Sequence, residues 1–242
     1  MLWIFELHNE PAPGNGYLFN GDMADRGANA VEIFMLLLAY KLACPEIIFM
    51  NRGNHEQRDL NERPFANGGG FAWECRRPLK TKRAARSGGQ QPPPSRPLLP
   101  PSYSWRCDGG SSDGGVTYDP PPSSFLTLCS LRCRKKYPHD ENLIELFQRF
   151  FMLLPVASVV GSWAFVIHGG LFRDTDVSLD DIQKINNKRQ PPLKLDTRDD
   201  ELLFDALWAD PHEGDGVTMG SARGGYSIQF GADVTKARLA PA

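Results

Sequence analysis

The chain has 242 residues, of which 41% are hydrophobic and 23% are charged, and its formal net charge is -2. This length and apolar content suffice for a hydrophobic core, which excludes wholesale disorder. The near-neutral charge excludes broad nucleic-acid or anionic-membrane binding, because both need a surplus of Lys and Arg. Small-molecule or protein substrates fit this composition better.

The five cysteines are odd in number and contain no Cys-x-x-Cys pair, so the sequence indicates neither a disulfide framework nor a zinc knuckle. A reducing compartment, the cytoplasm or the nucleus, is therefore expected. The apolar N-terminus has no basic region before it and is soon followed by Glu6, unlike a signal peptide. The longest apolar stretch, residues 31–43, is shorter than the ~20 residues that a membrane span requires.

Apolar segments alternate with polar, glycine-containing loops over the first 76 residues. Residues 17–20 (YLFN) predict a short strand that leads into the loop GDMADRG. Residues 30–42 predict a helix, because apolar side chains recur there at helical spacing. Residues 47–50 (IIFM) predict a buried strand that ends at NRGNHE.

The composition changes abruptly after Arg76. Residues 77–134 hold half of the 20 prolines and show little apolar periodicity, so they predict a disordered insertion. The basic run RRPLKTKRAAR at its start is typical of a solvated disordered segment, and a localisation signal or a patch for acidic partners is the alternative. The chain thus divides into an ordered part over 1–76, an insertion over 77–134 and a second ordered part over 135–242.

The second ordered part continues the alternation of helices and strands, which favours an α/β fold. The predicted elements are an amphipathic helix over 141–154, a strand pair in VASVVG and WAFVIHGG, a short helix opened by a capping box between Ser178 and Asp181, and a helix over 201–208.

Three predicted strands are each followed by polar side chains beside glycine. Strand ends are where an α/β sheet exposes reactive groups, and glycine lets the chain turn sharply there. Oxygen and nitrogen donors of Asp, Asn and His suit Mn, Fe or Zn, and a carboxylate such as that of Asp22 can bridge two ions. The clusters are Asp22, Asp25 and Arg26 after YLFN, Asn54, His55 and Glu56 after IIFM, and His168 after WAFVI.

This set of residues predicts hydrolysis of a phosphate ester. Two metal ions about 3.5–4 Å apart would activate a water molecule and hold a phosphoryl oxygen. The guanidinium groups of Arg26 and of Arg223 would bind the phosphate. His55, oriented by Asp25, would protonate the leaving alkoxide.

Each motif also has a structural interpretation. A single Gly-Asp loop is typical of a turn, and Asn54 with His55 could be capping and surface residues. Arg223 could be a surface cation or a salt-bridge partner. The three clusters together are more specific than any one of them.

The blocks GDMADRG, GNHE and HGGL, in this order, resemble the phosphoprotein phosphatase family of serine/threonine phosphatases, which has the calcineurin-like metallophosphoesterase fold. The stretches NNKRQPP, LWADP and SARGGYSIQFGADVTKARL are similar to its protein phosphatase five branch. The resemblance covers nearly everything outside the insertion. It implies an α/β fold with a central β-sandwich flanked by helices, incomplete here, in which 1–76 and 135–242 are the two parts of a catalytic domain truncated at its C-terminus.

The resemblance also implies substrates, partners and residue roles. The substrates would be phosphoserine and phosphothreonine proteins, with regulatory proteins as further partners and neither nucleic acid nor membrane among them. Two divalent ions, Mn, Fe or Zn, are the implied cofactors. The implied roles are Asp22 as the ligand bridging both metals, Asn54 and His168 as ligands of the second metal, Arg26, Asn54 and Arg223 as phosphate ligands, His55 as the acid with Asp25 as its partner, Asp210 as an acidic wall residue, and Glu56 as a support of its loop.

Two family features are missing from the sequence. A DxHG block that precedes GDxxDRG in the family is absent, and His8 does not replace it, while the chain stops before a later metal-binding histidine of the family. The first metal site would keep only Asp22, and the second would keep Asp22, Asn54 and His168. We therefore expect weak metal binding and little phosphatase activity. A non-catalytic interaction protein and a phosphoesterase acting on nucleotides or other diesters are the alternatives.

Overall fold

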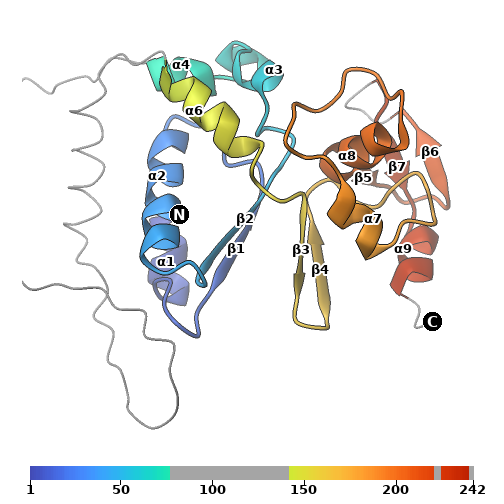
Figure 1. Cartoon of the computed structure of the whole chain (residues 1–242), viewed down its shortest axis with the longest axis horizontal. Helices are drawn as coiled ribbons and strands as arrows, with labels where there is room; N and C mark the ends of the chain where they lie inside the picture. Colours follow the sequence, from blue (N-terminus) through green and yellow to red (C-terminus); the bar gives the residue numbers. More distant parts are fainter. Residues whose placement is uncertain (77–141, 221–224, 240–242) are drawn as a thin grey trace, which may run out of the picture.

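The structure, a computed structural model, describes residues 1–76, 142–220 and 225–239 (Figure 1). The whole predicted insertion, residues 77–134, lies outside the described residues. Helices and strands alternate within the described ranges, as expected for the α/β class. No helix among the described residues is long and apolar enough to cross a membrane.

The first 76 residues form a parallel strand pair with a helical connection. β1 and β2 are the two predicted strands, and β1 pairs with β2 from Tyr17 opposite Ile48 to Asn20 opposite Asn51. The predicted helix between them is also confirmed as α2, whereas the short helices were not predicted. The elements are α1 (Leu2–His8), β1 (Tyr17–Asn20), α2 (Ala30–Ala43), β2 (Ile48–Asn51), α3 (Arg58–Asn61), the 3-10 helix η1 (Phe65–Asn67) and α4 (Phe71–Arg76).

Residues from 142 onward form the rest of the fold. β3 and β4 are the predicted antiparallel pair, with Ala157 opposite Ile167. The last helix of the prediction begins earlier than expected, because Thr197 and Asp200 form a capping box. The elements are α6 (Asn142–Phe151), β3 (Ala157–Val160), β4 (Ala164–Ile167), α7 (Leu179–Lys184), α8 (Arg198–Trp208), β5 (Asp210–Pro211), β6 (Val217–Met219), β7 (Ile228–Phe230) and α9 (Ala232–Leu239).

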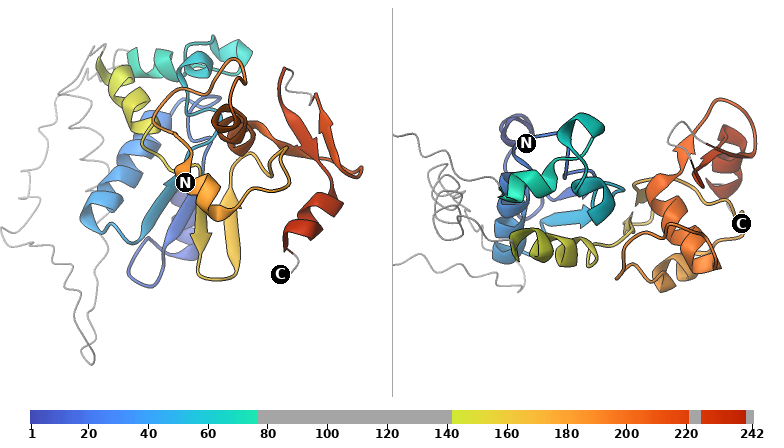
Figure 2. Two further views of the ribbon diagram at one scale, coloured as in Figure 1. Left: turned by 45° about the vertical axis from the view of Figure 1, so that its right-hand side comes forward. Right: turned by 90° about the horizontal axis from the view of Figure 1, so that it is seen from above.

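A cluster of phenylalanine rings joins the two ordered parts of the chain. The Phe34 ring of α2 lies 5.9 Å from the ring of Phe71 in α4 and 5.2 Å from that of Phe151 in α6. All three side chains are fully buried. Since burial of one such side chain stabilises a fold by about 1.5–3 kcal/mol, this cluster holds α6 against α2 and α4 (Figure 2).

Polar side chains connect the β1–β2 pair to the β3–β4 pair, which lies beside it (Figures 1 and 2). Asn20 Nδ2 donates to the Ile167 carbonyl oxygen at 2.9 Å, and Asn51 Nδ2 donates to that of Val166 at 3.1 Å. Asn20 and Asn51 are the last residues of β1 and β2. The loop that begins with His168 is thereby brought next to the ends of both parallel strands.

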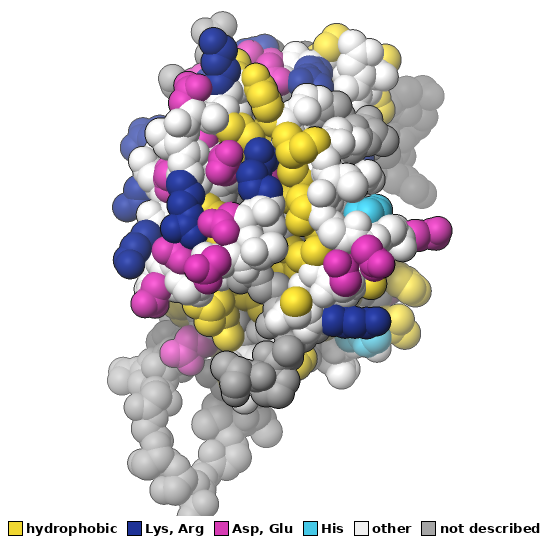
Figure 3. Space-filling view, turned by 90° about the vertical axis from the view of Figure 1, so that its right-hand side faces the viewer, with side chains coloured by type: hydrophobic (Ala, Val, Ile, Leu, Met, Phe, Trp, Pro, Cys, Tyr) yellow, Lys and Arg dark blue, Asp and Glu magenta, His cyan; other side chains and the backbone are white. Residues whose placement is uncertain are grey.

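The surface of the C-terminal part carries an apolar band with charged side chains of both signs beside it (Figure 3). Charged side chains of this part of the chain form ion pairs, as in Arg189 with Asp199 at 2.7 Å and with Asp200 at 2.6 Å. A separate hollow of about 350 Å³ lies between β3 and α7 and is lined mainly by apolar side chains. It contains none of the predicted site residues.

Candidate metal and phosphate site

The ends of β1 and β2 touch at two glycines. Gly21 has φ +80°, and a Cβ there would lie 2.5 Å from the Gly53 Cα. A Cβ at Gly53 would lie 2.6 Å from the backbone nitrogen of Asp22. Only glycine fits both positions, so the motifs GD and GNHE specify the close approach of the two loops.

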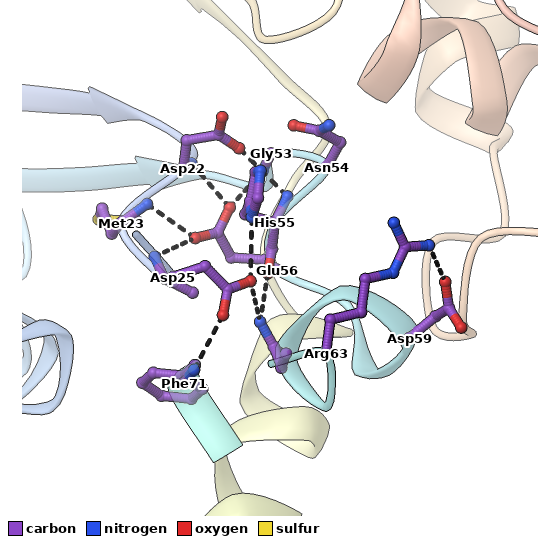
Figure 4. Close-up of polar contacts among 12 residues, drawn as sticks. Asp22, Met23, Asp25, Gly53, Asn54, His55, Glu56, Asp59, Arg63 and Phe71 are labelled. Atoms are coloured by element: carbon purple, nitrogen blue, oxygen red, sulfur yellow. Dashed lines mark hydrogen bonds and ion pairs between the residues drawn. The ribbon is translucent and has the colours of Figure 1, made fainter. Parts of the chain in front are cut away.

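The carboxylate of Glu56 organises the loop that follows β1 (Figure 4). It accepts the backbone N–H groups of Asp22 at 2.8 Å, Met23 at 2.8 Å, Ala24 at 3.0 Å and Gly53 at 2.9 Å. Burial raises the pKa of the Glu56 carboxyl above its usual value, and hydrogen bonds from the backbone act in the opposite direction. Glu56 is fully buried and thus supports the loop from within.

Three residues of this loop have left-handed backbone conformations although none is glycine. The φ angles are 54° at Asp22, 66° at Asp25 and 53° at Arg26. Such conformations cost about 1–3 kcal/mol each and persist only where the surroundings fix them. The hydrogen bonds to Glu56 are such a restraint, and they hold the Asp22 side chain at the strand end.

Asp25 and His55 form a buried pair. His55 Nδ1 lies 2.9 Å from Asp25 Oδ2, and because an ionised carboxylate only accepts, Nδ1 donates. The other Asp25 oxygen accepts the Phe71 N–H at 2.9 Å. His55 Nε2 has no hydrogen-bond partner among the described residues, and it is not fully enclosed, so it can reach a group that enters from outside.

Asp22, Asn54 and His168 converge around one point. His168 Nε2 lies 3.2 Å from Asp22 Oδ1 and 3.1 Å from Asn54 Oδ1. His168 Nδ1 lies 2.6 Å from the Asn20 carbonyl oxygen and donates to it, so that Nε2 is the nitrogen that can offer a lone pair to a cation. Three lone-pair donors then face one another, an arrangement that a positive charge between them stabilises.

This donor set fits a divalent cation. A ligating histidine whose second ring nitrogen donates to a carbonyl is typical of metal sites, and Asp and Asn oxygens suit Mn, Fe or Zn. Among the described residues, no group of three or more His, Cys, Asp or Glu side chains could hold a metal ion, so Asn54 is needed as the third donor. The residues present here thus fit one cation, which Asp22, Asn54 and His168 would hold.

The other predicted residues are placed as follows. Arg26 is exposed beside Asp25 and makes no ion pair with any described residue, which leaves its guanidinium free for an anion. Arg223 lies outside the described residues, so its role stays a prediction. Asp210 begins β5, in the sheet with order β5-β7-β6, and His8 is exposed at the end of α1.

Arg52 is an important residue that the sequence reasoning missed. It is fully buried, and its Nε donates to the Glu56 carbonyl oxygen at 3.1 Å. Burial lowers the pKa of Arg52 to about 10. Its Nη2 is the only enclosed side-chain nitrogen or oxygen without a partner in the part of the chain that the structure describes. Its position directly before GNHE was the available signal.

Asn61 and Gln148 were also missed. Asn61 Nδ2 donates to Asp25 Oδ2 at 2.8 Å and to the His55 carbonyl oxygen at 2.7 Å. Gln148 Nε2 donates to Asn61 Oδ1 at 2.7 Å. A glutamine within the apolar helix pattern was the signal for Gln148, whereas Asn61 gave none.

Comparisons with known proteins indicate the family to which the chain belongs. The model of the calcineurin-like phosphoesterase family matches residues 2–240. The chain is 32% identical to serine/threonine-protein phosphatase T of Schizosaccharomyces pombe over 98% of its own length and 35% of that protein. It is 31% identical to human serine/threonine-protein phosphatase 5 over 99% of its length and 33% of that protein.

A solved structure supports the same assignment. It is a protein serine/threonine phosphatase from Saccharomyces cerevisiae, described as similar to human phosphatase PP5, with a TM-score of 0.63 and 26% identity over 97% of this chain and 51% of that one. The chain spans about a third of the length of the curated relatives it matches. The predicted metallophosphoesterase fold is confirmed, and the chain belongs to the calcineurin-like phosphoesterase family.

Proposed function

We propose that this chain carries the site of a metal-dependent serine/threonine protein phosphatase that hydrolyses phosphoserine and phosphothreonine monoesters. The observation that carries the proposal is the convergence of Asp22, Asn54 and His168 next to the Asp25–His55 pair. The names of the relatives, all serine/threonine phosphatases, support the same substrate class. Regulatory proteins are proposed as further partners.

Each side chain has a task in this reaction. Asp22, Asn54 and His168 would hold the cation, with His168 oriented by its hydrogen bond to Asn20. A divalent metal supplies Lewis acidity and lowers the pKa of a water molecule when it is bound.

Two further groups act on the phosphate ester itself. The free guanidinium of Arg26 would bind two phosphoryl oxygens. His55, whose Nδ1–H donates to Asp25, would hold a proton at Nε2 and transfer it to the leaving serine or threonine oxygen. This transfer matters most for alkoxides, which are poor leaving groups.

We further propose that this polypeptide binds metal weakly and is a slow catalyst. Three protein donors hold a cation less firmly than a complete set, and the described residues offer no second group of His, Cys, Asp or Glu ligands. The same observation favours the second candidate, a non-catalytic interaction protein with this fold. A folded chain without metal that still binds phosphatase-associated proteins would support that candidate.

Manganese-dependent hydrolysis of a phosphoserine peptide by the purified 242-residue chain tests the proposal. We expect slow phosphate release that rises with Mn²⁺ and saturates only at high concentration. His55→Gln and His168→Ala should abolish it, whereas His8→Ala, at the exposed end of α1, should not change it. Absence of any release above the His168→Ala background would refute the enzyme, and fast release at micromolar Mn²⁺ would refute the weak metal site.

A further inference from the structure

A chain of side-chain amides leads from the loop after α7 to the Asp25–His55 pair. Gln190 Nε2 donates to Gln148 Oε1 at 3.2 Å, and Gln148 Nε2 donates to Asn61 Oδ1 at 2.7 Å. Asn61 Nδ2 then donates to Asp25 Oδ2 at 2.8 Å. The series thus crosses from a loop through α6 and α3 to the loop after β1.

The direction of this chain is fixed at both ends. At one end Gln190 Oε1 accepts the backbone N–H of Arg58 at 3.0 Å, and a backbone N–H can only donate. The Gln190 amide nitrogen must then face Gln148, and each following amide is oriented in turn. At the other end the Asp25 carboxylate can only accept, which requires the same orientation of Asn61.

Orientation of Asn61 matters for His55 in two ways. One N–H of its amide donates to Asp25 Oδ2, which also accepts the Nδ1–H of His55. The other N–H donates to the His55 carbonyl oxygen at 2.7 Å. A flipped Asn61 would present its oxygen to the carboxylate and to the carbonyl, which repels both. By donating to Asn61 Oδ1, Gln148 favours the one orientation in which Asn61 can donate to both acceptors.

We infer that Gln148 and Gln190 are positioning residues for His55 and that they act through Asn61 and Asp25. The inference rests on the proposed function, because a fixed His55 affects catalysis only if His55 acts on the substrate. Neither glutamine belongs to the three motif blocks.

The surroundings of Gln148 argue against a role in stability alone. It is 1% exposed and lies on the face of α6 that also buries Ile144 and Phe147. A buried amide stabilises a fold little even when it is fully hydrogen-bonded, and an apolar side chain of similar shape does as well. The amide at this position therefore orients the side chain of Asn61, which an apolar side chain cannot do.

NMR of the imidazole groups tests the inference on the full 242-residue chain without added metal. Long-range ¹H–¹⁵N spectra report the tautomer of each histidine and the exchange of its Nδ1–H, with His55 assigned through His55→Gln. We expect a protected Nδ1–H on His55 in the wild type. Gln148→Met, which keeps the unbranched shape, should accelerate its exchange at least about tenfold through local opening.

Ile144→Val is the matched control, because it also trims a buried side chain on α6 but takes no part in the hydrogen bonds between the amides. The Ile144→Val protein should give an unchanged His55 signal, even where its melting temperature is lowered as much as that of the Gln148→Met protein. An unchanged His55 tautomer and exchange rate in Gln148→Met would overturn the inference. If that variant fails to fold, Gln190→Met at the less buried end gives the same readout and the same decision.

The outcome is separate from that of the proposed function. A chain that hydrolyses no phosphate ester would refute the phosphatase proposal while the NMR result still decides whether the amides orient His55. If the chain is active, Gln148→Met should lower kcat for phenyl phosphate more than for p-nitrophenyl phosphate, whose leaving group needs no proton. Equal losses on both substrates would contradict positioning of an acid.

Discussion

Arg52 and Asn187 are 135 positions apart in the sequence, yet Arg52 Nη1 donates to the Asn187 carbonyl oxygen at 2.9 Å. The same nitrogen donates to the Arg189 carbonyl oxygen at 2.8 Å. Because Arg52 Nε also holds the Glu56 carbonyl oxygen, one buried guanidinium ties the GNHE loop to the loop after α7. The loop that carries Gln190 is thus fastened to the loop that carries Asn54 and His55.

Arg52→Lys should lower the free energy of unfolding by about 2–4 kcal/mol, because one ammonium group cannot reproduce the fork that reaches three carbonyl oxygens. Urea titration followed by tryptophan fluorescence measures this loss. Arg198→Lys is the control, since Arg198 is 53% exposed and its pair with Asp174 contributes little. Equal stability of the two variants would show that the Arg52 contacts are dispensable.

Gly53→Ala should destabilise the protein by about 2–5 kcal/mol and distort the Asp22 loop, because the atom nearest to the new methyl group belongs to the backbone and cannot rotate away. The methyl group would lie 2.6 Å from the Asp22 nitrogen and 2.8 Å from Glu56 Oε2. Gly16→Ala is the control, because its nearest neighbour would be 3.5 Å away. Thermal unfolding compares the two, and a Gly53→Ala protein as stable as the Gly16 variant would contradict the close approach of the strand ends.

Binding of Mn²⁺ should depend on His168. We expect His168→Ala to weaken the affinity at least about tenfold in isothermal titration calorimetry, because it removes one of three protein donors and the one with an oriented tautomer. His8→Ala should bind like the wild type, since His8 is exposed and no site residue contacts it. Metal affinity that is the same in both variants would place the cation elsewhere.

The sequence predicted the parts of the fold that follow from local pattern. The strands at 17–20 and 157–167, the helix from residue 30 and the capping box at Ser178 depend on periodicity and on short-range hydrogen bonds, and the structure confirms them. The short helices α3 and α4 were missed, because four to six residues carry too little periodic signal and tertiary packing decides their conformation. Phe71, for example, begins α4 and is buried against Phe34.

The candidate site was predictable where residues follow strand ends in motifs, as Asp22, Asn54 and His168 do. The supporting residues were not, because their contacts join distant segments. Gln148 and Asn61 are 87 positions apart, and no local rule pairs two amides across such a distance. The role of Arg52 could not be predicted for the same reason, since its partners are backbone carbonyl oxygens, which every residue has.

Buried Cys75 in α4 should be far less reactive toward alkylating reagents than Cys44, which is only partly buried. Burial, assisted by the neighbouring carboxylate of Glu74, raises the pKa of Cys75 from 9.0 to about 12. At pH 8 only about one thiol in ten thousand would then be ionised, and the thiolate is the reactive form. Site-resolved mass spectrometry after iodoacetamide treatment should show fast labelling of Cys44 and almost none of Cys75.

The pH dependence follows from the same shift. Between pH 9 and pH 12 the folded protein still holds the Cys75 proton, whereas the unfolded chain has lost it. The stabilisation from Cys75 is therefore complete below pH 9 and is lost as the pH rises toward 12. Labelling of Cys75 should therefore increase about tenfold per pH unit above pH 8 in the folded protein. In urea, Cys44 and Cys75 should be labelled at the same rate. Equal labelling rates of the two cysteines in the folded protein would mean that α4 does not pack against the aromatic core.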